Sequence, residues 1–163
     1  MDDCMRPISM NPIGVIHTPY NDPKGMPIQG TFDVGVQGSV SLFPPFVAGL
    51  KDIDGFSHLM LFYHLNRSTE ERITAKPFLE DIEHGIFASR FPHRPNHIGF
   101  SIVKLETVTA DGFTFSEVDM LDGTPLLDIK PHVNHFDSRS DVRCGWYDAH
   151  FENGNIPKRT KCG

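Results

Sequence analysis

The sequence predicts a mainly β, single-domain protein in which short antiparallel strands form a barrel or a sandwich, with one or two short helices. Six or seven segments have strand-like patterns, and 13 prolines and 14 glycines divide the chain into short elements. A length of 163 residues fits one domain. No G-x-G-x-x-G motif opens a βαβ unit, which argues against a Rossmann cofactor site.

The strand assignments rest on alternating or continuous apolar residues between turn signals. Ile98, Phe100 and Ile102 alternate with smaller or polar residues in the clearest case, and a turn at 110–112 leads into its partner strand. The nearly continuous apolar run at 57–65 predicts a strand buried on both faces. In chain order, the expected strands are 13–17, 34–43, 57–65, 85–90, 98–108, 113–120 and 126–129.

Two short helices are expected between these strands. Apolar residues at helical spacing predict a helix over 46–53, opened by Pro44 and Pro45. Ser68 to Glu71 is typical of a helix start, and Pro77 limits its length. We expect an N-terminal extension at 1–12, a barrel domain at 13–147 and a mobile polar tail at 148–163.

The overall charge and the cysteines narrow the class of protein. A net charge of −6 with a pI near 5.8 is not typical of a domain that binds nucleic acid by itself. It does not exclude a local basic patch. Three widely spaced cysteines without a CxxC pair indicate a reducing cytoplasm. No apolar run has the length of a membrane span.

A histidine cluster raises the question of a metal. His132, His135 and nearby Asp137 would suit a metal on a helix, but Pro131 and Asn134 predict a loop, and no cysteine supports the site. We therefore expect no metal.

Two stretches contain most of the polar and charged residues that are candidates for a functional site. In the first, Gly85 to Lys104, two prolines stiffen the loop Phe91–His97, which suits holding a ligand. In the second, Asp119 to Pro131, three carboxylates and a lysine surround a Gly-Thr-Pro turn.

These stretches fit the patterns G-x-F-A-[ST]-R-x-x-x-R-P-N-x-I-G and D-x-x-D-G-T-P-x-x-D-I-K-P. In this the chain resembles the TsaA/TrmO family, also called the YaeB-like or VirR family, from Ile13 to about Trp146. The resemblance implies a seven-stranded antiparallel barrel that binds S-adenosylmethionine near a dimer interface. It also implies methylation of N6 of threonylcarbamoyladenosine at position 37 of tRNA.

The resemblance further implies a set of cofactor-binding residues. A guanidinium suits the carboxylate of S-adenosylmethionine, carboxylates suit its ribose, and apolar walls suit its adenine. The expected residues are Pro27, Ile28, Gln29, His64, Leu65, Arg90, Phe100, Asp119, Met120, Leu121 and Asp122. Structural alternatives stay open: an ion pair for Arg90, a turn-forming role for Asp122, a core position for Phe100, and a satisfied structural histidine for His64.

The catalytic residue is unknown at this point. Asp122 or Asp128 would accept the proton that leaves the methylated nitrogen. Asp128 and Lys130 share one face of a strand, either as an acid–base pair or, as we favour, as a structural ion pair. For the substrate, the stiff loop offers Arg94, Asn96 and His97.

The chain departs from the family pattern at two site positions. His97 replaces a usual proline and His132 a usual tyrosine, and we expect a short form without the additional C-terminal domain of well-studied members. These departures keep two alternatives open: methylation of another RNA or a small molecule, and a non-catalytic cofactor-binding protein.

The expected partners are tRNA and a second copy of the chain. Contacts with tRNA phosphates need local cations, for which the candidates are Arg67, Arg72, Arg94, Lys104, Lys158, Arg159 and Lys161. Phe91 or Tyr147 would stack an exposed base.

Overall fold

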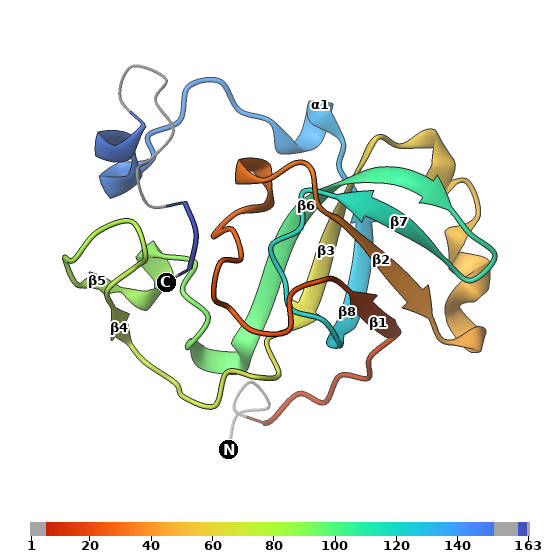
Figure 1. Cartoon of the computed structure of the whole chain (residues 1–163), viewed down its shortest axis with the longest axis horizontal. Coiled ribbons are helices and arrows are strands. Elements are labelled where there is room, and N and C mark those ends of the chain that lie inside the picture. The colour runs from red at the N-terminus through yellow and green to blue at the C-terminus, as the bar shows by residue number, and fades with distance from the viewer. Residues whose placement is uncertain (1–5, 152–159, 163) are drawn as a thin grey trace.

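Six antiparallel strands close into a barrel in the computed structural model, which describes residues 6–151 and 160–162 (Figure 1). The strands pair in the order β1-β2-β7-β6-β3-β8, and β8 also pairs with β1. They are β1 (Gly14–His17), β2 (Gln37–Leu42), β3 (His58–His64), β6 (Ile98–Val108), β7 (Gly112–Ser116) and β8 (Thr124–Pro131). The mainly β class is confirmed; a seventh barrel strand is not found among the described residues.

The barrel interior is filled by every second residue of each strand. Ile16, Leu61, Val103, Phe113 and Phe115 are fully buried there. Strand β3 corrects one expectation, because its residues alternate between buried and partly exposed and so it is not buried on both faces. One of its faces meets the barrel core, and the other lies on the outside of the barrel.

The expected strand at 85–90 is largely wrong. Only β5 (His84–Gly85) is extended, paired with β4 (Thr74–Ala75) in a separate two-stranded sheet. The 3-10 turn η5 (Ile86–Ala88) follows, because Ser89 N–H and its hydroxyl both donate to the Ile86 carbonyl and so bend the chain. Residues 89–94 therefore enter the site as a loop.

Strand β7 is shorter than the expected 113–120. It ends at Ser116 because Glu117 has a φ of 66°, a left-handed conformation that leaves the ladder. The chain then crosses the barrel mouth, with Val118 and Met120 buried and Asp119 between them.

The helical segments are short. Residues 44–55 form the 3-10 turns η3 (Pro44–Leu50) and η4 (Ile53–Gly55) instead of one helix over 46–53. No helix starts at Ser68, whose hydroxyl contacts Pro92 and His93 instead of capping. The remaining 3-10 turns are η2 (Gly30–Phe32), η6 (Pro95–His97) and η7 (Gly145–His150). The short α-helix α1 (Asn134–Asp137) lies where a loop was expected.

The end of the described chain returns to the barrel mouth. Lys161 forms an antiparallel bridge with Pro27, Ile28 N–H donates to the Thr160 carbonyl, and Cys162 N–H donates to Met26. This part of the polar tail is thus hydrogen-bonded to a predicted cofactor loop. The tail cations Lys158 and Arg159, and residues 1–5 of the N-terminal extension, lie outside the described residues.

An apolar strip covers the outside of β3 and β6. It consists of Met60 and Phe62 on β3 and Ile98, Phe100 and Ile102 on β6, and we call it the outer strip. Phe62 faces Phe100, with ring centroids 5.3 Å apart, and Met60 faces Ile102. Ile98 and Ile102 are 42% and 39% exposed, so apolar residues occupy positions where a solvated strand usually carries polar ones. Among the described residues, no helix is long and apolar enough to cross a bilayer.

Candidate functional site

A cavity of about 970 Å³ lies at one mouth of the barrel. Its barrel side comes from Tyr63, the start of β6 and the segment 119–121, and its other walls come from loops around 23–32, 65–68, 77–79, 89–94 and 144–151. Figure 1 shows these loops gathered beside the barrel, on the side away from η3 and η4. The volume matches pockets that enclose small molecules or cofactors.

Most residues predicted to bind the cofactor come together here. Nine of the eleven line the cavity: Pro27, Ile28, Gln29, Leu65, Arg90, Phe100, Asp119, Met120 and Leu121. His64 and Asp122 do not. Five separate segments supply the nine residues, so the cavity brings together residues that lie far apart in the sequence.

Asp119 is held firmly at the barrel mouth. Its Oδ1 accepts a 2.5 Å hydrogen bond from the Ser101 hydroxyl, and its Oδ2 accepts a 3.2 Å bond from Gly30 N–H. Ser101 in turn contacts the Tyr63 hydroxyl at 2.8 Å. Burial raises the pKa of Asp119 to about 6, against the lowering effects of its hydrogen bonds and of nearby Arg90.

The motif glycine Gly99 makes room for Tyr63. The two residues are direct partners on β6 and β3, and a Cβ on Gly99 would lie 2.0 Å from the Tyr63 ring. Only glycine therefore lets this ring lie flat across the strand and carry its hydroxyl to Ser101. Burial and the charge of Asp119 raise the pKa of Tyr63, which keeps the phenol protonated.

Arg90 brings a positive charge to the cavity. Its Nη1 donates a 2.7 Å hydrogen bond to Gln29 Oε1, and the side chain remains exposed to the cavity. The contact is to an amide, so Arg90 keeps its charge free for an anionic ligand and does not form the alternative Arg–Asp ion pair with a carboxylate of the motif.

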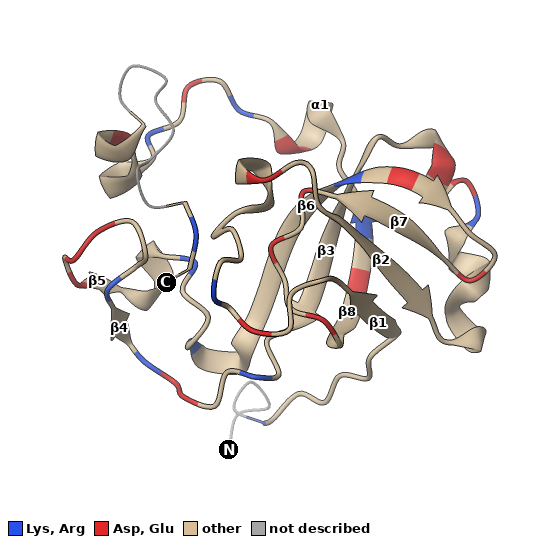
Figure 2. Ribbon diagram, viewed as in Figure 1, with Lys and Arg blue, Asp and Glu red and all other residues tan. Residues whose placement is uncertain are grey.

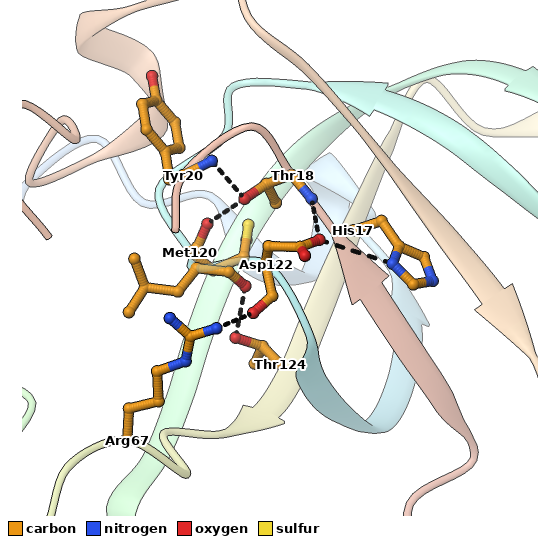
Figure 3. A network of polar contacts seen from close by, with 8 residues as sticks. His17, Thr18, Tyr20, Arg67, Met120, Asp122 and Thr124 are labelled. Carbon is orange, nitrogen blue, oxygen red and sulfur yellow. Dashed lines mark hydrogen bonds and ion pairs between the residues drawn. The ribbon is translucent and has the colours of Figure 1, made fainter. Parts of the chain in front are cut away.

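Asp122 has a structural position, as the turn-forming alternative suggested. Figure 3 shows its carboxylate directed toward Thr18 N–H, at 3.1 Å, and His17 Nδ1, at 3.6 Å, while its backbone carbonyl accepts a hydrogen bond from Arg67. Gly123 follows with a φ of 75°. Asp122 thereby ties the end of β1 to the cavity segment without lining the cavity.

The substrate-binding candidates and His64 also divide into residues that line the cavity and residues that do not. Arg94 lines the cavity and donates to the Ser89 carbonyl, but Asn96 and His97 do not line it. Both have positive φ, and His97 Nε2 contacts the Glu70 carbonyl. His64 is exposed beside His97.

Asp128 and Lys130 also lie outside the cavity. They do share one face, as predicted, and form a 2.9 Å ion pair. Their side chains are 49% and 57% exposed on the outside of the barrel, beside the outer strip, so they do not form a buried acid–base pair. Of the three catalytic candidates, none reaches the cavity.

Of the wall formed by η7, only Tyr147 was expected at the site, as a ring that would stack an exposed base. Trp146 stacks on Tyr147, with centroids 3.8 Å apart, and donates from Nε1 to the Ala88 carbonyl. Glu80 contacts both His84 and His150, the latter at 2.8 Å. These contacts hold η7 against the loop that carries Arg90. A sequence offers only separate aromatic and charged residues here, with no periodicity that pairs them.

Three of the cationic side chains proposed to contact RNA form ion pairs with carboxylates. Arg72 pairs with Glu70, Lys104 with Glu106 and Lys161 with Asp33. Figure 2 shows Lys and Arg on the loops beside the barrel and on its strands, interspersed with Asp and Glu. Arg67 and Arg94 line the cavity itself. In the described part of the chain, no group of three His, Cys, Asp or Glu residues is arranged to hold a metal.

Comparison with known families identifies relatives over most of the chain. The family model of the tRNA-methyltransferase O N-terminal domain matches residues 15–138. A probable S-adenosyl-L-methionine-binding protein of Pyrococcus abyssi is 46% identical over 141 residues, which cover 86% of this chain and 77% of that protein. A tRNA (adenine(37)-N6)-methyltransferase of Mus musculus is 40% identical over 96 residues, which are 57% of this chain and 22% of that protein.

The fold has a close counterpart among solved structures. The crystal structure of TrmO from Pseudomonas aeruginosa superposes with a TM-score of 0.74 at 34% identity, covering 86% of this chain and 63% of that one. The chain thus spans about three quarters of the Pyrococcus protein but less than two thirds of the Pseudomonas protein.

Proposed function

Because the chain belongs to the family of the tRNA-methyltransferase O N-terminal domain, we propose that it is an S-adenosylmethionine-dependent methyltransferase. Its proposed acceptor is N6 of threonylcarbamoyladenosine at position 37 of tRNA. The observation that supports this best is the cavity in which nine of the eleven predicted cofactor residues meet. The relatives named above for S-adenosylmethionine binding and for adenine-N6 methylation of tRNA support the same activity.

The residues of the cavity fit S-adenosylmethionine. Arg90 offers a guanidinium for the methionyl carboxylate, and Asp119 offers a carboxylate for the ribose hydroxyls. Pro27, Ile28 and Leu121 provide apolar surface for the adenine. The cofactor would supply an electrophilic methyl group on a sulfonium centre.

The protein contributes mainly by positioning. A methyl group moves in line between two atoms, so holding both reactants in alignment provides much of the rate enhancement. Arg90 and Asp119 both line the cavity and would bind two different groups of one ligand. The stiff 91–97 loop and the η7 wall, which carry Arg94 and Tyr147, leave the remaining part of the cavity for the acceptor base.

We also propose that the protein is a cytoplasmic homodimer that uses the outer strip as its interface. Apolar residues at the centre of the strip, with Asp128, Lys130 and Lys104 around it, suit a second copy of the same face. Ile98 and Phe100 belong to both the strip and the cavity wall, so a partner there would lie next to the site. Free thiols at Cys144 and Cys162 are consistent with a reducing compartment.

Turnover with defined substrates tests the methyltransferase proposal. Purified protein should release S-adenosylhomocysteine with tRNA that carries threonylcarbamoyladenosine, but not with tRNA that lacks this modification or with a metabolite extract. Mass spectrometry of tRNA from a strain without the gene should show loss of the N6-methyl derivative. If S-adenosylmethionine binds but no substrate is methylated, the protein is a binding protein and the enzymatic proposal fails.

A further inference from the structure

His93 occupies a constrained position in the cavity wall. Its Nδ1 lies 2.7 Å from the Ser68 hydroxyl, its ring packs edge-on to Phe91 with centroids 5.4 Å apart, and its carbonyl accepts a hydrogen bond from Arg72 N–H. The side chain is half-buried and lines the cavity. Two of these contacts fix the ring itself, so its second nitrogen has a defined direction.

The Ser68 contacts suit a proton on Nδ1 of the His93 ring. The Ser68 hydroxyl lies 3.2 Å from the Pro92 carbonyl as well as 2.7 Å from His93 Nδ1. A carbonyl only accepts, so we infer that the single hydroxyl proton goes to Pro92 and that the serine oxygen accepts from Nδ1–H. The neutral ring therefore has its lone pair on Nε2, for which no hydrogen-bond partner occurs among residues 6–151 and 160–162.

We propose that His93 Nε2 accepts the proton released when the acceptor nitrogen is methylated. In this step a nitrogen–carbon bond forms, the carbon–sulfur bond breaks, and its electron pair stays on sulfur. The nitrogen then carries one proton too many, which passes to Nε2 and leaves an imidazolium whose Nδ1–H still donates to Ser68. This inference rests on the proposed function and assigns a catalytic residue to it.

Other groups at the cavity are less suited to the step. In the proposed function Asp119 binds the cofactor ribose, and burial raises the pKa of the Tyr63 phenol and of the Cys162 thiol. The charges near His93 come from two elements. Glu70, held by Arg72, belongs to the segment that carries Ser68, and Arg94 belongs to the same loop as His93.

Kinetics of the full chain on modified tRNA give the first test. His93→Gln should lower kcat by roughly 100-fold or more and remove the acid limb of its pH profile, with unchanged affinity for S-adenosylmethionine. Imidazole should partly restore His93→Ala. Ser68→Ala, which affects positioning only, should lower kcat by about three- to tenfold and shift the acid limb. His135→Gln, an exposed histidine on α1, is the matched control.

Nitrogen-15 NMR of the imidazole rings gives a second test that needs no turnover. At pH 8, His93 should carry its proton on Nδ1, and this preference should disappear in Ser68→Ala. A proton on Nε2 in wild type overturns the proposal whatever the activity. If wild type is active and His93→Gln keeps its rate and pH profile, only the His93 role is refuted; if wild type methylates nothing, the proposed function fails together with it.

Discussion

Arg90 and Gln29 are 61 positions apart in the sequence, yet Arg90 Nη1 donates a 2.7 Å hydrogen bond to Gln29 Oε1 across the cavity wall. The contact joins two loops that the family resemblance assigned to the cofactor. It also presents the guanidinium to the cavity without neutralising it, because an amide oxygen carries no net charge.

Replacement of Arg90 tests the cofactor site directly. Arg90→Ala should weaken S-adenosylmethionine binding by roughly 1.5–3 kcal/mol, because a charge-assisted hydrogen bond to the ligand is lost. Isothermal titration calorimetry measures this change. Arg139→Ala removes a cation that contacts only carbonyls near α1 and is the control. A folded Arg90→Ala protein that binds as wild type would show that Arg90 is purely structural.

Asp119 should make the folded state less stable as pH rises. Its pKa is about 6 in the folded protein, against an ordinary value of 3.8, so between these values the folded chain holds a proton that the unfolded chain has released. Stability therefore decreases as pH rises from 3.8 to 6 and stays lower above that window.

Asp119→Asn removes this titration. At pH 7.5 it should raise the free energy of unfolding by roughly 1–3 kcal/mol relative to wild type, and the gain should vanish below pH 4. Urea denaturation at both pH values measures it. The same variant should bind S-adenosylmethionine more weakly, since the ribose loses a carboxylate. Destabilisation at pH 7.5 would contradict the raised pKa.

Glu80 should hold the η7 wall in place. Hydrogen bonds from His84 and then His150 lower the pKa of Glu80, so its contribution to stability is complete above the ordinary value of 4.5 and is lost as pH falls through the lowered pKa. Glu80→Gln should increase hydrogen exchange of residues 145–151 and change the fluorescence of Trp146, the single tryptophan. Glu83→Gln, which removes a contact with Thr74 in the same loop, should do neither.

The outer strip should hold two copies together. Wild type should have twice the mass of the 18.3 kDa chain in light scattering, and Ile102→Asp should convert it to monomers, because a carboxylate would be buried in an apolar interface. Phe136→Asp changes an exposed apolar residue on α1 and is the control. A wild-type monomer at micromolar concentration would refute the dimer proposal.

Arg94 should contribute to RNA affinity through its charge. Each phosphate contact adds close to one unit to the slope of log affinity against log salt, so Arg94→Ala should flatten that slope by about one. Filter binding of tRNA at several salt concentrations measures it. Lys104→Ala is the control and should leave the slope unchanged, because the Lys104 ammonium pairs with Glu106 away from the cavity. If Arg94→Ala has the same slope as wild type, Arg94 contacts no phosphate.

Prediction from the sequence succeeded where the local hydrophobic pattern of a strand agrees with its burial in the folded barrel. Strand β6 was predicted to the residue, because alternation of Ile98, Phe100 and Ile102 coincides with true inside–outside burial. The strand at 113–120 was too long, since nothing local indicates that Glu117 takes a left-handed conformation. The sequence also did not separate Asp119 from Asp122: both belong to one motif in the segment between β7 and β8, but only Asp119 lines the cavity.

Side chains that act through distant partners were beyond prediction. Ser68 is a residue type that often caps helices, yet its hydroxyl contacts the ring of His93, 25 positions away. Glu80 meets His150 across 70 positions, and no spacing rule relates them. Such contacts exist only after loops have been brought together by the barrel.

The antiparallel bridge between Lys161 and Pro27 has a practical consequence for protein engineering. An affinity tag joined directly after Cys162 would adjoin the residue whose N–H and carbonyl hold the loop at 25–26 beside the cavity. A C-terminal purification handle therefore risks lowering ligand affinity in a way that mimics a defective site. Fusion at the N-terminal end, followed by cleavage, keeps that loop in its native pairing.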